Sequence, residues 1–306
     1  GLDGFKKSLE DLGHDIIAFF YDEYLNNTEQ LQKDLIKKAD EIKPDLISFY
    51  LFQDQFNIAT LDYLKSKYTT MNWFGDDQWR FDNFTVNYAN HFSYCVTTDK
   101  YSIPKYHNIG QSNIIYSQWA AVNTHEIPKF KDYKYDVSFV GGFHPYRKWF
   151  IETLQKKGIN IQAFGNGWPN GSLSAEEMNT VFTSSKINLN IANSNSFDIR
   201  YLFSYWKAIP LLFRSKKNAS QIKARNFEIP YFNGFQLTDY APTIENYFDI
   251  GDELICYKDV DEAALLIKYY LENEEEREII KNKAHKKAIE EHGYINRLKY
   301  VLEKIV

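Results

Sequence analysis

Cysteine and long apolar runs are both scarce in this sequence of 306 residues. Its two cysteines, Cys95 and Cys256, lie far apart, each inside an apolar run. We therefore expect two buried thiols rather than a disulfide or a metal site, and a reducing cytoplasm is the default compartment. No stretch approaches the roughly twenty apolar residues of a membrane span, and no signal peptide is recognisable.

Patterns typical of metal and nucleic-acid binding are lacking too. The seven histidines are scattered without ligand spacing. A net charge of −5 without a basic stripe argues against a nucleic-acid partner, because neutralising phosphates requires clustered Lys and Arg. Asp259 and Asp261 spell a pattern that can hold a divalent metal, yet Asp259 stands three residues before Glu262 at the head of an apolar-striped helix. That spacing indicates a capping box, so we expect no metal.

The sequence is rich in alternating helix and strand patterns. This alternation predicts an α/β fold in which parallel sheets are covered by helices. Thr28 to Ile42 is the clearest helix, and Asp261 to Glu272 and Glu274 to Glu291 are the last long ones. The expected strands are Ile16 to Phe20, Leu46 to Leu51, Met71 to Phe74, Tyr94 to Thr97, Asn113 to Tyr116, Val137 to Val140, Ile159 to Phe164, Ile187 to Ile191, Phe235 to Leu237 and Glu253 to Tyr257.

The length suits two domains. We place the boundaries at 1–128, 129–290 and 291–306, with the mixed segment from Ser117 to Lys134 as the connection. Parallel sheets bind ligands at the carboxyl ends of their strands. The chain opens with a helix where such a domain normally begins with a strand, so we expect a truncated N-terminus.

The most informative segment runs from Lys223 to Tyr240 and reads KARNFEIPYFNGFQLTDY. Asn226 is expected to cap a helix, and Gly234 to end it in a left-handed conformation. Arg225 and the free helix amides suit a diphosphate, while Glu228, one turn later, suits the hydroxyls of a ribose. The alternative is a helix terminus with an ordinary surface ion pair.

A two-glycine loop, DVSFVGGFHPYRKWF, is a second candidate for binding a diphosphate. Gly141 and Gly142 would let a substrate approach the backbone, and Arg147 and Lys148 would neutralise its charge. The alternative is a routine turn between a strand and a helix, with solvated basic residues.

These motifs carry a resemblance to a known family. The run RNFEIPYFNGFQLTDY, with the downstream residues that follow it, resembles the C-terminal half of CgeB-type glycosyltransferases, named for a spore maturation protein. The match continues more loosely upstream, through DVSFVG and FGNGW. The downstream residues are Ile244, Glu245, Phe248, Gly251, Asp252, Glu253, Tyr269, Tyr270, Leu271, Glu291, His292, Gly293, Tyr294 and Arg297.

The resemblance implies the GT-B architecture, in which two Rossmann-like domains face each other across a cleft and the C-terminal helix crosses back to the first domain. It implies a metal-independent glycosyltransferase that moves a hexosyl or deoxyhexosyl group from a nucleotide-sugar donor, without a cofactor. The acceptor would be a glycan or a lipid-linked molecule, in the assembly of a bacterial-type surface or spore-coat glycan. Residues 129–290 would bind the donor, and residues 1–128 would face the acceptor.

The resemblance also implies further site residues. Gly167 and Trp168 would border the nucleotide base, where Trp168 either stacks or closes a turn with Pro169. An acceptor base is expected in the first domain: Asp77, in a loop after a strand, or Asp3 near the N-terminus. The alternative to a catalytic role for Asp77 is a structural one, in a polar turn.

One departure from the family pattern leaves the mechanism open. Retaining enzymes of the commonest GT-B type carry two glutamates separated by seven residues. Glu228 matches the second, but Ser220 stands where the first is expected. Retention and inversion therefore both remain open. So do two alternatives: a catalytically inactive nucleotide-sugar-binding protein and a nucleotide-sugar epimerase.

The aromatic and basic segment from Ile199 to Lys217 has two interpretations. It is a core helix and strand broken at Pro210, or it lies on a membrane surface and meets a lipid-linked acceptor. In the second interpretation, the protein is cytoplasmic and also binds peripherally to the inner face of the membrane.

Overall fold

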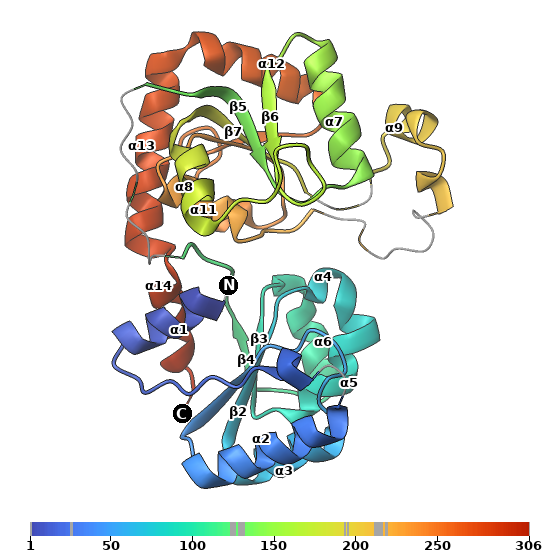
Figure 1. Cartoon of the computed structure of the whole chain (residues 1–306), viewed down its shortest axis with the longest axis vertical. Helices are drawn as coiled ribbons and strands as arrows, with labels where there is room; N and C mark the ends of the chain where they lie inside the picture. Colours follow the sequence, from blue (N-terminus) through green and yellow to red (C-terminus); the bar gives the residue numbers. More distant parts are fainter. Residues whose placement is uncertain are drawn as a thin grey trace. The chain divides into compact units, whose positions relative to one another are not determined.

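The computed structural model describes residues 2–24, 27–122, 127, 132–192, 194, 196–210, 217 and 220–305, without the side chains of residues 2 and 3 (Figure 1). The chain divides into two compact units: Gly1–Ser8 with Trp119–Asn296, and Leu9–Gln118 with Arg297–Val306. Two of the three divisions fall inside the first helix, α1 (Leu2–Asp11), and the last, α14 (Tyr294–Leu302), and the third lies between Gln118 and Trp119. Residues 123–126 and 128–131 of the expected connection lie outside the described residues.

The unit that contains Leu9–Gln118 is built on a four-stranded parallel sheet. Its strands are β1 (Leu46–Phe49), β2 (Thr69–Phe74), β3 (Tyr94–Thr97) and β4 (Ile114–Tyr116), which pair in that order. Its helices and helical turns are η1 (Tyr21–Tyr24), α2 (Thr28–Ile42), α3 (Ile58–Lys67), α4 (Asp77–Arg80), η2 (Phe81–Thr85), α5 (Val86–Tyr88), η3 (Ala89–His91), η4 (Lys100–Ser102) and α6 (Ile103–Asn108).

Helix α2 forms with the bounds that the sequence predicts. The Asn27 side chain accepts a hydrogen bond from the amide of Gln30, and Lys43 ends the helix in a left-handed conformation. Leu31 and Leu35 are buried in the core of this unit, because apolar residues at helical spacing share one face. The prediction of this helix is confirmed.

The strand expected from Ile16 to Phe20 does not form, so that prediction is wrong. Residues 14–20 are described and contain neither helix nor strand, and the sheet begins at β1. Ile17 and Phe20 are exposed rather than packed in a sheet. Instead, the Ala18 carbonyl accepts a hydrogen bond from Lys38 of α2, whose ammonium lies 5.6 Å from the centre of the Phe19 ring.

The unit that contains Trp119–Asn296 is built on a five-stranded parallel sheet. Its strands are β5 (Tyr135–Val140), β6 (Ile161–Phe164), β7 (Ser185–Asn190), β8 (Gln236–Asp239) and β9 (Ile255–Tyr257), in the order β6-β5-β7-β8-β9. Its further helices are α7 (Pro145–Lys156), α8 (Ala175–Thr183), α9 (Ile199–Ser204), α11 (Arg225–Tyr231), η5 (Ile244–Asn246), α12 (Val260–Glu272) and α13 (Glu274–Glu291).

Helices cover both faces of this sheet (Figure 1). Phe139 of β5 belongs to the cluster formed with α7 and α12, whereas its neighbour Val140 packs with Phe182 of α8 and Ile229 of α11. Successive strand residues point to opposite faces, so these helix pairs lie on opposite sides. Together with the other parallel sheet, this arrangement confirms the predicted α/β class.

The strand order creates a switch point beside β5. The chain passes from β5 to β6 on one side and then to β7 on the other. In open parallel sheets, ligands bind outside the carboxyl ends of the strands where the order reverses in this way.

Two further expectations concern the thiols and the membrane. Cys95 and Cys256 are both free thiols, and Cys256 is only partly buried. Among the described residues, no helix combines the length and apolar character needed to cross a bilayer.

Candidate functional site

A cavity of about 370 Å³ lies at the switch point of the five-stranded sheet. Gly141 and Ala192 line it from the ends of β5 and β7, and Asp239 lines it from the end of β8. Arg225 and Glu228 line it from α11. All of its lining residues belong to the unit that contains Trp119–Asn296, so the cavity is formed within one compact body.

The structure brings four of the predicted donor-binding residues to this cavity: Gly141, Arg147, Arg225 and Glu228. They come from two segments of this unit that are far apart in the sequence, one containing Gly141 and Arg147 and the other containing Arg225 and Glu228. The parallel sheet places both segments at one edge, because every strand ends on the same side.

Arg225 and Glu228 form an ion pair at the wall of the cavity. Arg225 Nη1 lies 2.9 Å from Glu228 Oε2, and the two side chains are 23% and 13% exposed. The Arg225 guanidinium also lies 5.0 Å from the centre of the Phe182 ring. The pair is therefore partly desolvated and held in place, unlike an ion pair fully exposed on the surface.

The expected cap of α11 is wrong. The helix begins at Arg225, and Asn226 lies inside it, where its Oδ1 accepts a hydrogen bond from the Lys223 amide at 3.0 Å. The amides of Asn226 and Phe227 already donate to the carbonyls of Lys223 and Ala224, each at 2.9 Å. These amides are not available to a diphosphate, so positive charge at this end comes from side chains.

The end of α11 also differs from the prediction. Asn233, not Gly234, is left-handed, with φ of 57°. Glycine is required at 234 for another reason: a Cβ there would lie 2.6 Å from Nδ2 of Asn188 on β7. The absence of a side chain at Gly234 therefore lets the turn after α11 lie close to β7.

Arg147 joins the two loops at the switch point. Its Nε and Nη2 donate to the Ile191 carbonyl at 3.0 and 2.7 Å, and its Nη1 donates to the Gly142 carbonyl at 2.9 Å. Burial lowers the pKa of Arg147 to about 10, so the guanidinium stays charged at neutral pH. Arg147 therefore supplies both positive charge and a fixed shape to the cavity.

Lys148 and Gly142 are not among the residues that line this cavity. Lys148 is exposed on α7 and lies 3.7 Å from Glu152, one turn along the same helix. Arg147 and Lys148 are neighbours on a helix, so their side chains point about 100° apart, and only one can face the sheet edge.

Trp168 supports the glycine loop. Its indole N–H donates to the Gly141 carbonyl at 2.9 Å, and its half-buried ring packs near Phe139 and Phe143. Neither Gly167 nor Trp168 lines the cavity. The aromatic residue that does so is Trp119, which the sequence analysis missed because it lies far away, before β5.

Asp239 is a site residue that the sequence analysis also missed. Its Oδ1 accepts a hydrogen bond from the Ala192 amide at 3.0 Å, and its Oδ2 accepts one from the Ser220 hydroxyl. Burial raises the pKa of the Asp239 carboxyl. The signal available in the sequence was its position at the carboxyl end of a buried strand, where β8 ends.

Asp77, the predicted acceptor base, belongs to the other unit and begins α4. It is buried and accepts hydrogen bonds from the hydroxyls of Thr85, Thr97 and Tyr106, at 2.6, 2.5 and 2.7 Å. Burial raises its pKa to about 6. It lines a small cavity of about 170 Å³. The side chain of Asp3, the rival base, lies outside the described residues.

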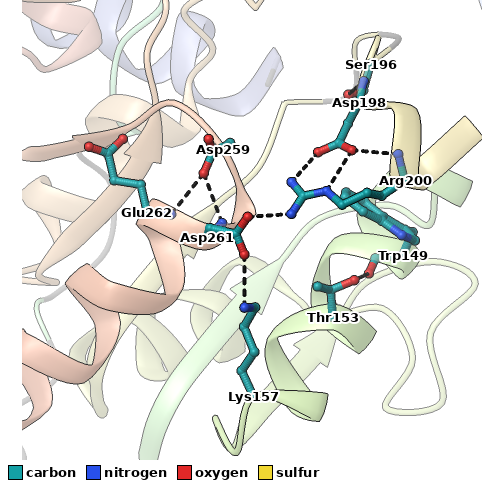
Figure 2. A network of polar contacts seen from close by, with 9 residues as sticks. All are labelled: Trp149, Thr153, Lys157, Ser196, Asp198, Arg200, Asp259, Asp261 and Glu262. Carbon is teal, nitrogen blue, oxygen red and sulfur yellow. Dashed lines mark hydrogen bonds and ion pairs between the residues drawn. The ribbon is translucent and has the colours of Figure 1, made fainter.

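The Asp259–Asp261 pattern lies at the N-terminus of α12, where Asp259 caps the helix (Figure 2). Asp259 Oδ1 accepts hydrogen bonds from the amides of Asp261 and Glu262, at 3.0 and 2.9 Å, which confirms it as the cap of α12. Glu262 completes the cap by accepting from the amide of Lys258. Asp261 pairs with Lys157 at 2.9 Å. Among the described residues, no cluster of His, Cys, Asp and Glu could hold a metal ion.

Together, the doubly wound sheet and its charged cavity are typical of proteins that bind nucleotides. The chain belongs to the glycosyl transferase-like family, whose model matches residues 147–303. No curated protein sequence matches it.

Solved structures of similar shape agree on the fold. TarM has a TM-score of 0.61 and 9% identity, over 90% of this chain and 58% of its own. HepE from Anabaena, in complex with UDP, has a TM-score of 0.60 and 11% identity, over 98% and 89%. T4 phage BGT, in complex with its UDP-glucose substrate, has a TM-score of 0.55 and 11% identity, over 99% and 92%. These likenesses establish the GT-B fold with two Rossmann-like domains.

Proposed function

We propose that this protein is a CgeB-type glycosyltransferase that moves a sugar from a nucleotide-sugar donor to an acceptor hydroxyl. The observation that carries the proposal is the convergence of Arg225, Glu228 and the Gly141 loop on one cavity at the switch point. Membership of the glycosyl transferase-like family supports it, as do the UDP and UDP-glucose complexes of HepE and BGT.

In this proposal, Arg225 binds the diphosphate. Among the described residues, Arg225 contacts Glu228 and Met178 through Nη1, and a guanidinium carries five N–H donors. Lys223 lines the same cavity and adds positive charge, while Arg147 fixes the loop that Gly141 opens to the donor. Cationic side chains placed beforehand stabilise the charge that develops on the leaving diphosphate, so the transfer proceeds without a metal.

Glu228 would bind the ribose. A carboxylate accepts hydrogen bonds from two neighbouring hydroxyls, and Arg225 orients this one through their 2.9 Å contact. Asp239 would act as a positioning residue. It joins the loop after β7 to the segment before α11 through Ala192 and Ser220.

The acceptor would bind to the first of the proposed domains, 1–128, while 129–290 hold the donor and 291–306 form the returning helix. Asp77 or Asp3 would accept the proton of the acceptor hydroxyl. With a pKa of about 6, Asp77 is mostly ionised at neutral pH, as a base must be. Hexosyl or deoxyhexosyl transfer to a surface or spore-coat glycan, or to its lipid-linked precursor, fits this proposal.

The test is release of nucleoside diphosphate from a panel of nucleotide sugars, each with and without a panel of glycan acceptors. We expect release that requires an acceptor and persists in the presence of a chelator. Conversion of the donor without any acceptor would instead identify an epimerase. Saturable donor binding without turnover would identify a binding protein.

A further inference from the structure

Five large apolar side chains around α9 face solvent: Phe197, Ile199, Phe203, Trp206 and Ile209. We call them the α9 surface. Phe203 is 83% exposed and Trp206 69% exposed. For these described residues the core interpretation of the sequence is wrong. Single exposed apolar residues are ordinary, but five large ones within thirteen consecutive positions are typical of a surface that binds a partner.

The segment that displays the α9 surface lies beside α7 and contacts it (Figure 1). Tyr201 is buried, with its ring 5.3 Å from that of Tyr146 and 5.7 Å from that of Trp149. Ala208 is buried as well. The same short segment therefore has one side packed on the body of the protein and another side left in solvent.

Ionic contacts reinforce this attachment (Figure 2). Arg200 holds Asp198 through Nε and Nη2, at 3.0 and 2.7 Å, and also pairs with Asp261 at the start of α12. The hydrogen bond from Arg200 lowers the pKa of Asp198. Asp198, the single acid between Phe197 and Lys217, is thus neutralised by a partner beside it.

We propose that the α9 surface docks this protein onto a membrane whose surface carries anionic phospholipids. Tryptophan and phenylalanine are the side chains that insert at the boundary between headgroups and acyl chains. Lys207 is exposed beside them and forms no ion pair with any residue that the structure describes. Of the five basic residues in the sequence from Phe197 to Lys217, Arg200 is paired with Asp198 and Asp261, and Lys217 lines the cavity described above. The remaining three are Lys207, Arg214 and Lys216, in a chain of net charge −5.

This charge distribution favours a membrane over a second copy of the chain. A symmetric dimer through the α9 surface would bring the same basic segment of both copies together, and like charges would repel. An anionic bilayer offers the opposite charge and an apolar layer at once. The proposal does not depend on the proposed transfer reaction, because it concerns binding alone.

The test is co-sedimentation of the whole chain with vesicles, in low salt. One set contains equal amounts of phosphatidylglycerol and phosphatidylcholine, and the other contains phosphatidylcholine only. We expect the wild type to bind the anionic vesicles, and the double variant Phe203→Ser with Trp206→Ser to bind at least about tenfold more weakly. Lys207→Glu should also weaken binding to the anionic vesicles by about tenfold.

Leu265→Ser is the matched control, because Leu265 is 70% exposed on α12 and lies outside the α9 surface. It should bind vesicles like the wild type. Circular dichroism melts show that each variant is folded before binding is compared. The proposal is overturned if the wild type stays in the supernatant, or if the double variant binds as well as Leu265→Ser. It is also overturned if the double substitution abolishes a dimer that forms without vesicles.

Discussion

Replacing Arg225 by lysine is the most specific test of the proposal that the Arg225 guanidinium binds the diphosphate. Lysine keeps the positive charge but loses the planar fork that binds two oxygens at once. It also loses the packing of the guanidinium on the Phe182 ring, at 5.0 Å, and the geometry of the 2.9 Å contact with Glu228. We therefore expect weaker binding of UDP although the charge of the protein is unchanged.

The magnitude follows from the strength of charged hydrogen bonds. Loss of one such bond in a partly buried site costs about 1–2 kcal/mol, which raises the dissociation constant of UDP about 5- to 30-fold. Arg225→Gln also removes the charge and should cost about 2–3 kcal/mol, or about 30- to 150-fold. Titration calorimetry with UDP measures both values, and thermal melts of the free variants report whether folding is intact.

Lys148→Ala is the control, because Lys148 is exposed and lies outside the cavity. Its UDP affinity should stay within about twofold of the wild type, as expected for an exposed charge. Equal affinity of Arg225→Lys and the wild type would refute the role given to the guanidinium fork. A loss in Lys148→Ala as large as that in Arg225→Lys would refute the location of the site.

Three further outcomes are expected. Glu228→Gln should weaken UDP binding by about 1–2 kcal/mol without weakening pyrophosphate binding in competition assays, because the ribose contact is lost while Arg225 keeps its charge and loses only its anionic partner. Asp239→Ala should lower the free energy of unfolding in urea by about 1–3 kcal/mol, since it leaves the Ala192 amide and the Ser220 hydroxyl without their acceptor, whereas Asp239→Asn should lower it less. For Asp77, the folded pKa of about 6 lies above the ordinary aspartate value of 3.8, so the folded state holds the proton more tightly and stability falls as pH rises between these values. Over this range the unfolding free energy of the wild type should fall by about 3 kcal/mol more than that of Asp77→Asn, and parallel urea curves for the two proteins would contradict the raised pKa.

The strands that form the two sheets were predictable because parallel strands are buried on both faces. Such strands read as short, nearly continuous apolar runs, as in Val137 to Val140 and Tyr94 to Thr97. The expected strand from Ile16 to Phe20 has the same local pattern and forms no strand. Local apolarity does not reveal whether a neighbouring strand is present to accept the pairing.

The candidate site was predictable where the signal is local in sequence. Arg225 and Glu228 lie one turn apart, so a helix between them suffices to bring them together. Trp119 was missed because the cavity wall joins residues from segments far apart in the chain. The sequence also did not decide whether the α9 surface is exposed. An aromatic segment has the same sequence pattern whether it is buried in the core or exposed to solvent.

The most direct test of the account is a crystal structure of this chain with UDP at saturating concentration. We expect the diphosphate within hydrogen-bonding distance of the Arg225 guanidinium, and the ribose hydroxyls on the Glu228 carboxylate, inside the cavity at the ends of β5, β7 and β8. UDP bound elsewhere on the chain, or a cavity left empty of nucleotide under these conditions, would contradict the central claim.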